Sequence, residues 1–405
     1  MARLWSSGAE LNSVTNGIEF DTKLGSGTTS IDSTVKRSGT YSMKIAASAQ
    51  NGGGERFQYS SALVEGALYV RTYFRIEVSS DVDNIGILRA IGTGGNVEVR
   101  LQADDTLILY NTEDSAQIGS ASSALALNTW YRIELKVDST AKAATLVEAR
   151  IDGTAFASGT VNLADGNNTV DFLGNHNVGP NSHTGTYYHD DMAINDGTGS
   201  FQNSWPGEES IIHLRPSAVG DADEWDLTTS YENIDEVTPD DATTVIASLT
   251  SGQIHDVNID DTPVALGHGD RINVVHIGVR FNESVGTDPD PTFVLRVKAS
   301  AGGTVEETSD ITASTTSWST NAVAAPRNYV LTLYNLPGTD NQPWTKYALD
   351  SAQIGVRLTN TPVGLAQVSA LWMVVCYTPD TKKKPHNSIR NISVGNGMSR
   401  NDYAS

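Results

Sequence analysis

The chain has a single cysteine, Cys376, and no hydrophobic run long enough to cross a membrane. One thiol excludes an intrachain disulfide, and its place in the apolar run from Leu371 to Tyr377 indicates a small buried side chain. No segment reaches the ~18 consecutive apolar residues that a membrane helix needs. The opening MARLWSSGAELNS also lacks the apolar stretch of a signal peptide, so we expect synthesis as a soluble protein in the cytoplasm.

Basic residues are scarce: 27 Lys and Arg stand against 48 Asp and Glu, giving a formal net charge of −21. Such a surface repels nucleic acid and anionic membranes, and we expect neither as a partner. The final segment, residues 381–405, is the exception, because Asp402 is its one acidic residue. Its basic residues are Lys382, Lys383, Lys384, Arg390 and Arg400.

Helix-forming patterns are also rare, whereas glycine and short alternating apolar runs are frequent. The 36 glycines, with abundant Thr, Val and Ser, favour many short strands joined by turns. A length of 405 residues allows two such domains, each with its own core. We therefore predict an all-β protein with two antiparallel β-sandwich domains in tandem.

The boundary between these domains falls at residues 187–207, YYHDDMAINDGTGSFQNSWPG, where a strand-like run gives way to turn residues. We predict a first sandwich over residues 1–207 and a second over 208–380. Residues 208–247 are dense in Asp and Glu and are predicted to be an acidic linking segment with a solvated surface. Residues 381–405 are predicted to be a short basic C-terminal arm.

Period-two alternation is clearest in two strands. In the first domain, Ile133, Leu135 and Val137 share one face, and we expect them, with Trp130, in the core or at its margin. In the second domain, Val275, Ile277, Val279 and Phe281 form an apolar face. The opposite face, with Val274, His276, Gly278 and Arg280, is mixed in character.

Three phrases in the first half carry a resemblance to a known fold family. NTWYRIELKVD, then ARIDGT, then YYHDDMAIND resemble a strand, a hairpin tip and the last strand of the concanavalin A-like or laminin-G-like jelly roll. That family defines a fold better than it defines an activity.

Longer phrases resemble virion structural proteins of tailed bacteriophages: MARLWSSGAELNS, DDMAINDGTGSFQNSWPG and IIHLRPSAVGDADEWD with YENIDEVTPDDATTVIAS. The resemblance implies a structural component on the virion exterior, as a capsid decoration, neck or tail, or fibre protein. It also implies other virion proteins and further copies of the chain as partners. We expect the basic arm to pack on a neighbouring copy or on another virion protein, the alternative being that it folds back on its own second domain.

Familiar catalytic patterns are missing. No strand carries the E-x-D-x-x-E spacing of glycosidases that share the jelly roll, and no G-x-S-x-G elbow or phosphate-binding glycine loop occurs. The acidic clusters at Asp221 and Glu232 have the wrong spacing. We therefore predict a protein that is not an enzyme and that has no cofactor apart from a candidate calcium ion.

Two binding sites are open candidates near the last strand of the first domain. Lectin-like jelly rolls hold Ca²⁺ on loop carboxylates and amides, which nominates Asp190, Asp191 and Asn195 as ligands. In the alternative reading, one Asp faces solvent and the other hydrogen-bonds a loop backbone. A carbohydrate site would combine stacking aromatics with amides, and its candidates are Asn175, His176, Asn177, Tyr187 and Tyr188. The alternative there is that the tyrosines are half-buried strand residues.

The leading hypothesis from the sequence is a non-enzymatic structural component of a phage virion. Its main rival is a carbohydrate-binding adhesin or receptor-binding protein that uses the first domain to recognise a host-surface glycan. A glycosidase is the weaker third alternative.

Overall fold

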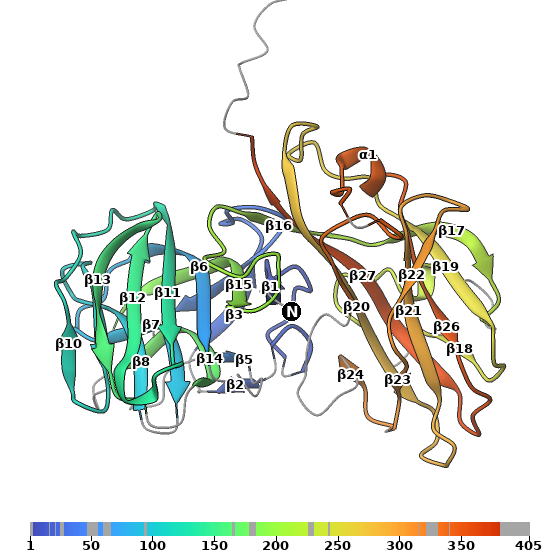
Figure 1. Ribbon diagram of the computed structural model, residues 1–405, viewed down its shortest axis with the longest axis horizontal. Coiled ribbons are helices and arrows are strands. Elements are labelled where there is room, and N and C mark those ends of the chain that lie inside the picture. The colour runs from blue at the N-terminus through green and yellow to red at the C-terminus, as the bar shows by residue number, and fades with distance from the viewer. Residues whose placement is uncertain are drawn as a thin grey trace, which may run out of the picture.

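The computed structural model describes residues 3–380, apart from residues 16, 21, 25–27, 47–55, 60–65, 93–94, 164–166, 178–183, 226–230, 242–243, 315, 321–330 and 340. The described chain is almost entirely β-strand, as the sequence predicts (Figure 1). Its helical segments are α1 (Lys346–Leu349) and the 3-10 turns η1 (Lys142–Ala144) and η2 (Tyr231–Asn233). No described helix is long and apolar enough to span a membrane.

Strands of the first half form two antiparallel sheets. Sheet I has the order β13-β12-β11-β6-β15-β4-β3, with β1 paired to β15. Its strands are β1 (Arg3–Ser7), β3 (Thr28–Asp32), β4 (Ser42–Ala46), β6 (Ala67–Val78), β11 (Trp130–Asp138), β12 (Thr145–Ile151), β13 (Thr154–Val161) and β15 (Thr186–Asp196).

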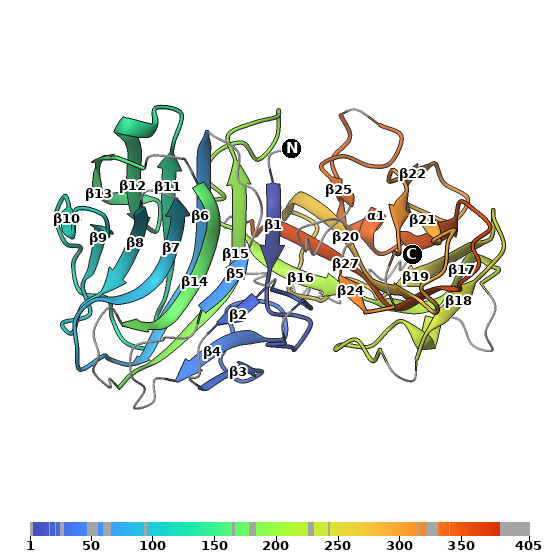
Figure 2. The ribbon, with the colours of Figure 1, turned by 90° about the horizontal axis from the view of Figure 1, so that it is seen from below.

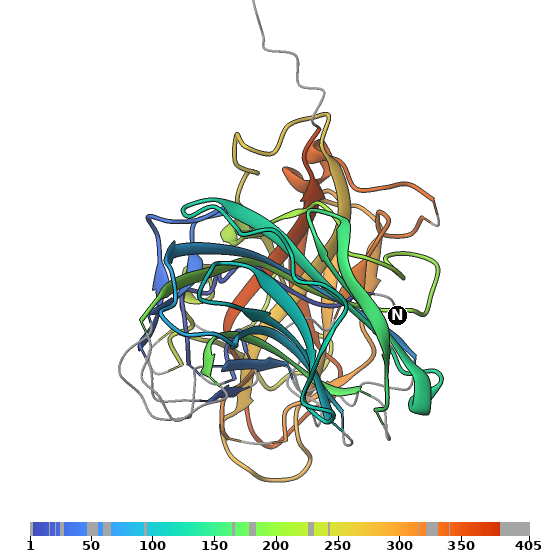
Figure 3. The ribbon, with the colours of Figure 1, turned by 90° about the vertical axis from the view of Figure 1, so that its left-hand side faces the viewer.

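Sheet II has the order β10-β9-β8-β7-β14-β5-β2. Its strands are β2 (Thr22–Leu24), β5 (Arg56–Tyr59), β7 (Ile85–Gly92), β8 (Gly95–Leu101), β9 (Leu107–Asn111), β10 (Ala116–Ile118) and β14 (Asn167–Asn177). Together, sheets I and II form the first sandwich, which faces the viewer in Figure 3.

The alternating residues of these strands build the core between the two sheets. Ile133, Leu135 and Val137 of β11 are fully buried there, as predicted, together with Val97 and Val99 of β8. Trp130 lies at the margin: it is partly exposed on the opposite face of β11, with its ring centroid 6.4 Å from that of Tyr188.

The second half repeats the arrangement with two further sheets, seen beside the first sandwich in Figure 2. Sheet III comprises β16 (Ser210–Leu214), β18 (Ile246–Ser248), β20 (Arg271–Glu283), β24 (Ser319–Thr320), β25 (Leu331–Leu333) and β27 (Ala366–Thr378). Sheet IV comprises β17 (Pro216–Asp223), β19 (Ile254–Ile259), β21 (Thr292–Lys298), β22 (Val305–Glu307), β23 (Ile311–Thr312) and β26 (Gln353–Leu358).

The mixed face of β20 has a structural explanation. Val275, Ile277, Val279 and Phe281 fill the core of the second sandwich. On the other face, Val274 joins the core of the first half, as do Trp372, Val374 and Cys376 of β27. Both faces of this part of sheet III are therefore buried, one in each sandwich.

The acidic segment 208–247 differs from its prediction. It contains β16 and β17 and runs into β18, so it supplies strands to both sheets of the second sandwich. Glu209 is fully buried, whereas Glu208 keeps half of its side chain exposed. The apolar residues Ile211, Ile212 and Leu214 mark β16, but the many carboxylates elsewhere in segment 208–247 obscured that signal. The predicted basic arm, 381–405, lies outside the described residues.

Candidate functional site

The predicted calcium ligands Asp190 and Asp191 lie at a bulge in β15, where Asp191 adopts a positive φ of 45°. Asp190 Oδ2 accepts a hydrogen bond of 2.7 Å from the backbone N–H of Arg37, and its Oδ1 accepts one from Asp191 N–H. Asp191 pairs with the Arg37 guanidinium at 2.6 Å and accepts hydrogen bonds from Ser38 Oγ and Ile211 N–H. Burial, together with the neighbouring Asp191, raises the pKa of Asp190 well above its usual range.

Asn195, the third predicted ligand, is held elsewhere. Its Oδ1 accepts a hydrogen bond of 2.5 Å from Arg3 Nε, and its Nδ2 donates to the carbonyl of Ser204. The structure thus brings Asp190 and Asp191 together around Arg37 and places Asn195 beside Arg3. Among the described residues, no cluster of three or more His, Cys, Asp or Glu could hold a metal ion. Calcium binding stays a prediction.

The predicted carbohydrate-binding tyrosines are buried rather than half-buried. Tyr187 is 0% exposed, and its ring stacks on Phe74 in the core. Tyr188 is 1% exposed on the other face of β15, where its hydroxyl donates to Glu77. A sugar ring cannot stack on an aromatic face that solvent does not reach, so neither tyrosine is available in this arrangement. The backbone of residues 175–177 lies in β14, but the side chains of Asn175, His176 and Asn177 are outside the described part.

Part of the outer face of sheet I is covered by the segment that leads into the second half. Gly207 N–H donates to Glu134, and Arg71 donates to the carbonyl of Gly207. Arg150 lies over the ring of Trp205 at 3.9 Å. These contacts lay the connecting segment 205–209 across sheet I, which leaves the outer face of sheet II as the other broad face of the sandwich.

That outer face carries a cluster of charged residues, which we call the sheet II cluster: Arg89, Glu98, Arg100 and Tyr110. Register places Arg89 of β7 opposite Glu98 of β8, and Glu98 opposite Tyr110 of β9. Since directly paired residues project from the same face, the three form a row across the strands. The pairing extends to Asp171 of β14 at one end and to Gln117 of β10, through Tyr110, at the other.

Side-chain contacts tighten this cluster. Glu98 Oε2 accepts a hydrogen bond of 2.6 Å from Arg100 Nε, and Glu98 Oε1 lies 3.6 Å from Arg89 Nη1. The Arg100 guanidinium lies 3.6 Å above the centre of the Tyr110 ring. Arg89, Glu98 and Arg100 are at most 4% exposed, whereas Tyr110 is partly exposed.

Burying three charged side chains on the outside of a sandwich core costs desolvation energy, which the ion pairs only partly offset. The guanidinium groups of Arg89 and Arg100 lie on either side of the Glu98 carboxylate. Arginine forks recognise carboxylates and other oxygen acceptors in a fixed plane, and an aromatic ring beside them offers a surface for a sugar. The cluster is therefore suited to an oxygen-rich, anionic ligand.

Reasoning from the sequence missed the sheet II cluster, although a signal was present. In NVEVRLQADDTLILYN, Val97, Val99 and Leu101 alternate with Glu98 and Arg100. That alternation is equally typical of an ordinary strand face exposed to solvent. Only the burial of Glu98 and Arg100, which the structure shows, distinguishes a buried charged cluster from such a face.

Comparison with known proteins agrees with the fold of the first half. Residues 13–196 match the family model described as polysaccharide lyase-like, Cip1-like core domain. No curated protein matches the chain.

Several solved structures have limited similarity to part of this chain. The cellulose-induced protein Cip1 has a TM-score of 0.35 and 16% identity over 45% of this chain and 88% of its own. An endo-β-1,4-glucuronan lyase from the fungus Trichoderma reesei has a TM-score of 0.35 and 15% identity, covering 48% and 95%. A carbohydrate esterase from the Shiga toxin-encoding bacteriophage phi24B has a TM-score of 0.35 and 15% identity, covering 48% and 99%.

The family match corrects one prediction. A protein that is not an enzyme was expected because glycosidase and nucleophile motifs are missing, and a match to a polysaccharide lyase-like family contradicts that expectation. The physical reason is that paired carboxylates belong to one hydrolytic mechanism, and their absence does not exclude other reactions on sugars. Residues 13–196 are thus similar to a Cip1-like, polysaccharide lyase-like core domain with a β-sandwich fold.

Proposed function

We propose that the chain is a carbohydrate-active protein whose first sandwich binds a polysaccharide on the outer face of sheet II. The observation that carries this proposal is the buried Arg89–Glu98–Arg100 set with Tyr110 beside it, within the segment that matches the polysaccharide lyase-like family. This proposal takes up the carbohydrate-binding alternative from the sequence and moves its site from the β15 tyrosines to sheet II.

The favoured ligand is a polysaccharide with carboxylate groups, such as a polyuronate. Glu98 pairs with Arg100 at 2.6 Å and approaches Arg89 at 3.6 Å, so one carboxylate is shared between two guanidinium groups. A sugar carboxylate at the edge of this set would accept hydrogen bonds in the plane of a guanidinium group. Neutralising that carboxylate would also make the proton on the adjacent carbon easier to remove, which is the first step of an elimination.

Binding to a panel of polysaccharides tests the proposal. The full chain is titrated with alginate, β-1,4-glucuronan and, as neutral comparisons, arabinan and cellulose oligosaccharides. Tyr110→Ala removes the partly exposed ring beneath Arg100 and should weaken binding at least tenfold, about 1.4 kcal/mol. Lys136→Ala is the matched control, because Lys136 is a partly exposed residue on the outer face of sheet I. Equal binding by both variants, or no binding of the wild-type chain to any polyuronate, would contradict the proposal.

Incubation with the polysaccharide that binds, followed by assay for unsaturated sugar ends, tests whether binding leads to elimination.

The place of the chain on a virion, with other virion proteins as partners, stays a prediction from the phrases quoted above. Mass spectrometry of purified particles tests it, and absence of the chain from them would end that hypothesis.

A further inference from the structure

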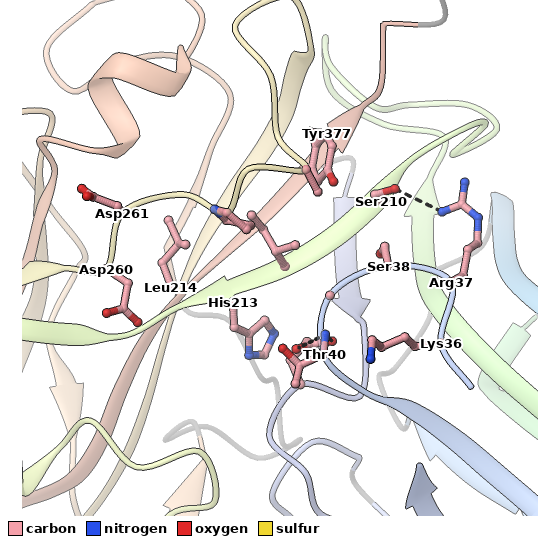
Figure 4. Close-up of a pocket in the computed structure, with 15 residues that line it drawn as sticks. Lys36, Arg37, Ser38, Thr40, Ser210, His213, Leu214, Asp260, Asp261 and Tyr377 are labelled. Carbon is pink, nitrogen blue, oxygen red and sulfur yellow. Dashed lines mark hydrogen bonds between the residues drawn. The ribbon is translucent and has the colours of Figure 1, made fainter. Parts of the chain in front are cut away.

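A pocket of about 780 Å³ lies between the two halves of the chain, and its lining includes no residue of the sheet II cluster. One wall comes from the first half and includes Glu10, Lys36 and Thr40. The other comes from the second half and includes His213 of β16 with Asp260 and Asp261 of the loop after β19. We call it the junction pocket (Figure 4). Its volume is in the range of small-ligand sites.

The junction pocket contains an unusual buried group. Both ring nitrogens of His213 are buried and have no hydrogen-bond partner among the described residues. In Figure 4 the imidazole projects toward Thr40 and Lys36, with the Asp260 carboxylate on its other side. An imidazole that is not hydrogen-bonded costs free energy, which a ligand offering both a donor and an acceptor would recover.

The charges around the pocket disfavour an ionic ligand. The Arg37 guanidinium is already paired with Asp191 at 2.6 Å and Glu208 at 2.8 Å. Lys36 faces two carboxylates, Asp260 and Asp261, across the pocket. An anion would be repelled by these carboxylates, and a cation would be repelled by Lys36. An uncharged ligand avoids both repulsions.

The deepest acidic group is also suited to a neutral ligand. Glu10 is 4% exposed, and its carboxyl accepts hydrogen bonds from Thr40 N–H at 2.9 Å and Tyr41 N–H at 3.1 Å. Burial raises the pKa of Glu10 to about 8, so the group carries a proton at neutral pH. Burial also lowers the pKa of His213 well below its usual range and keeps the imidazole neutral. Both groups then offer donors and acceptors without charge.

We propose that the junction pocket binds a short neutral saccharide of one to three sugar units. Hydroxyl groups of the sugar would pair with His213, Glu10 and the rim carboxylates. Pro263 of the lining is exposed and would meet an apolar face of the ring. The choice of a saccharide among polyhydroxylated ligands rests on the proposed function, whereas the site itself is separate from the sheet II cluster.

The test uses the full chain and an occlusion of the pocket that removes no buried group. Ala265 is an exposed residue that lines the pocket, and Ala265→Trp places a large ring at its rim. Val264→Trp is the matched control, because Val264 is 99% exposed and is not part of the lining. Cellobiose, xylobiose, maltose and arabinobiose serve as probes in calorimetric titration and in saturation-transfer NMR.

We expect at least one of these disaccharides to bind with a stoichiometry of one. Ala265→Trp should weaken that binding at least tenfold, while Val264→Trp and Tyr110→Ala leave it unchanged. Binding that survives Ala265→Trp but is lost in Tyr110→Ala would assign the sugar to sheet II, which overturns the junction pocket and retains the proposed function. Failure of all four disaccharides to bind the wild-type chain would also overturn the junction pocket, whatever the polyuronate titrations show.

Discussion

Several buried carboxyl groups near the junction of the two halves keep their protons to unusually high pH. Burial raises the pKa of Glu10 to about 8 and that of Glu19 to about 7. Between the ordinary pKa of 4.5 and these values, the unfolded chain loses protons that the folded chain retains. Stability from these groups is therefore complete below pH 4.5 and falls as the pH rises toward 8.

Glu10→Gln should reduce this pH dependence, because the amide keeps an acceptor for Thr40 N–H and does not titrate. Between pH 5 and 8 the wild-type chain should lose stability relative to the variant, by at most about 1.4 kcal/mol per pH unit. Urea unfolding at four pH values measures the difference. Parallel curves for the two proteins would show that Glu10 ionises in the folded chain much as it does in the unfolded chain.

The core of the first sandwich provides a packing test. Leu135 is 0% exposed between sheets I and II, so Leu135→Ala should cost about 2 to 5 kcal/mol of unfolding free energy. Leu146 on neighbouring β12 is 52% exposed, and Leu146→Ala should cost under about 0.5 kcal/mol. Urea unfolding compares the two, and similar losses would mean that the faces of β11 and β12 are assigned incorrectly.

At the scale of residues, sequence periodicity identified core positions better than sites. Ile133, Leu135 and Val137 could be assigned to the core because alternation with charged neighbours is a local pattern. The hydrogen-bond partners of Asp190 and Asp191 could not be identified from the sequence, since Arg37 is more than 150 positions away in the chain. Nor does a sequence show that Glu98 and Arg100 are buried, because burial depends on what covers a sheet.

At the scale of elements, Glu209 connects strands from both halves just before β16 begins. Its Oε2 pairs with Arg3 of β1 at 2.8 Å and with Arg71 of β6 at 2.7 Å, and its Oε1 accepts a hydrogen bond from Asn273 of β20. Glu209, Arg3 and Arg71 all have 0% side-chain exposure. The two arginines lower the pKa of Glu209 although burial acts in the opposite direction.

Glu209→Gln should therefore destabilise the chain by about 3 to 5 kcal/mol, because it leaves two buried guanidinium groups without a carboxylate. Glu208→Gln is the neighbouring control. Its side chain is 50% exposed, so its pairs with Arg37 and Arg132 should contribute under about 1 kcal/mol. Thermal and urea unfolding measure both variants. Equal effects would imply that water reaches the Glu209 network.

The elements themselves were largely predictable from alternation: the segment NTWYRIELKVD contains β11, and INVVHIGVRFNE lies within β20. The acidic segment was harder to interpret, because β16 buries its residues through pairing with β27, which lies far along the chain: Ser210 pairs with Tyr377 and Leu214 with Met373. Gly278 illustrates the same limit: a Cβ there would lie 2.2 Å from the Trp372 ring, and this close packing is visible only once β20 and β27 are paired.

At the scale of the whole molecule, the two sandwiches share a buried boundary rather than a flexible link. Ile211, Val274, Trp372 and Val374 of the second half belong to the hydrophobic cluster of the first. Contact across the boundary also includes His276, whose Nε2 lies 3.3 Å from Ser6 Oγ. Interfaces between independent domains are usually more polar than this, so relative motion of the halves should be small.

We therefore expect the full chain to unfold in one cooperative thermal transition, with similar calorimetric and van't Hoff enthalpies. Unfolding the second sandwich alone would expose Trp372, Val374 and Cys376 and leave Arg3 and Arg71 without Glu209, so a half-folded state is disfavoured. Glu209→Gln should weaken this coupling and broaden or split the calorimetric peak, whereas Glu208→Gln should leave a single peak. Two separate transitions in the wild-type chain would show that each sandwich is stable without the other and that the shared boundary contributes little.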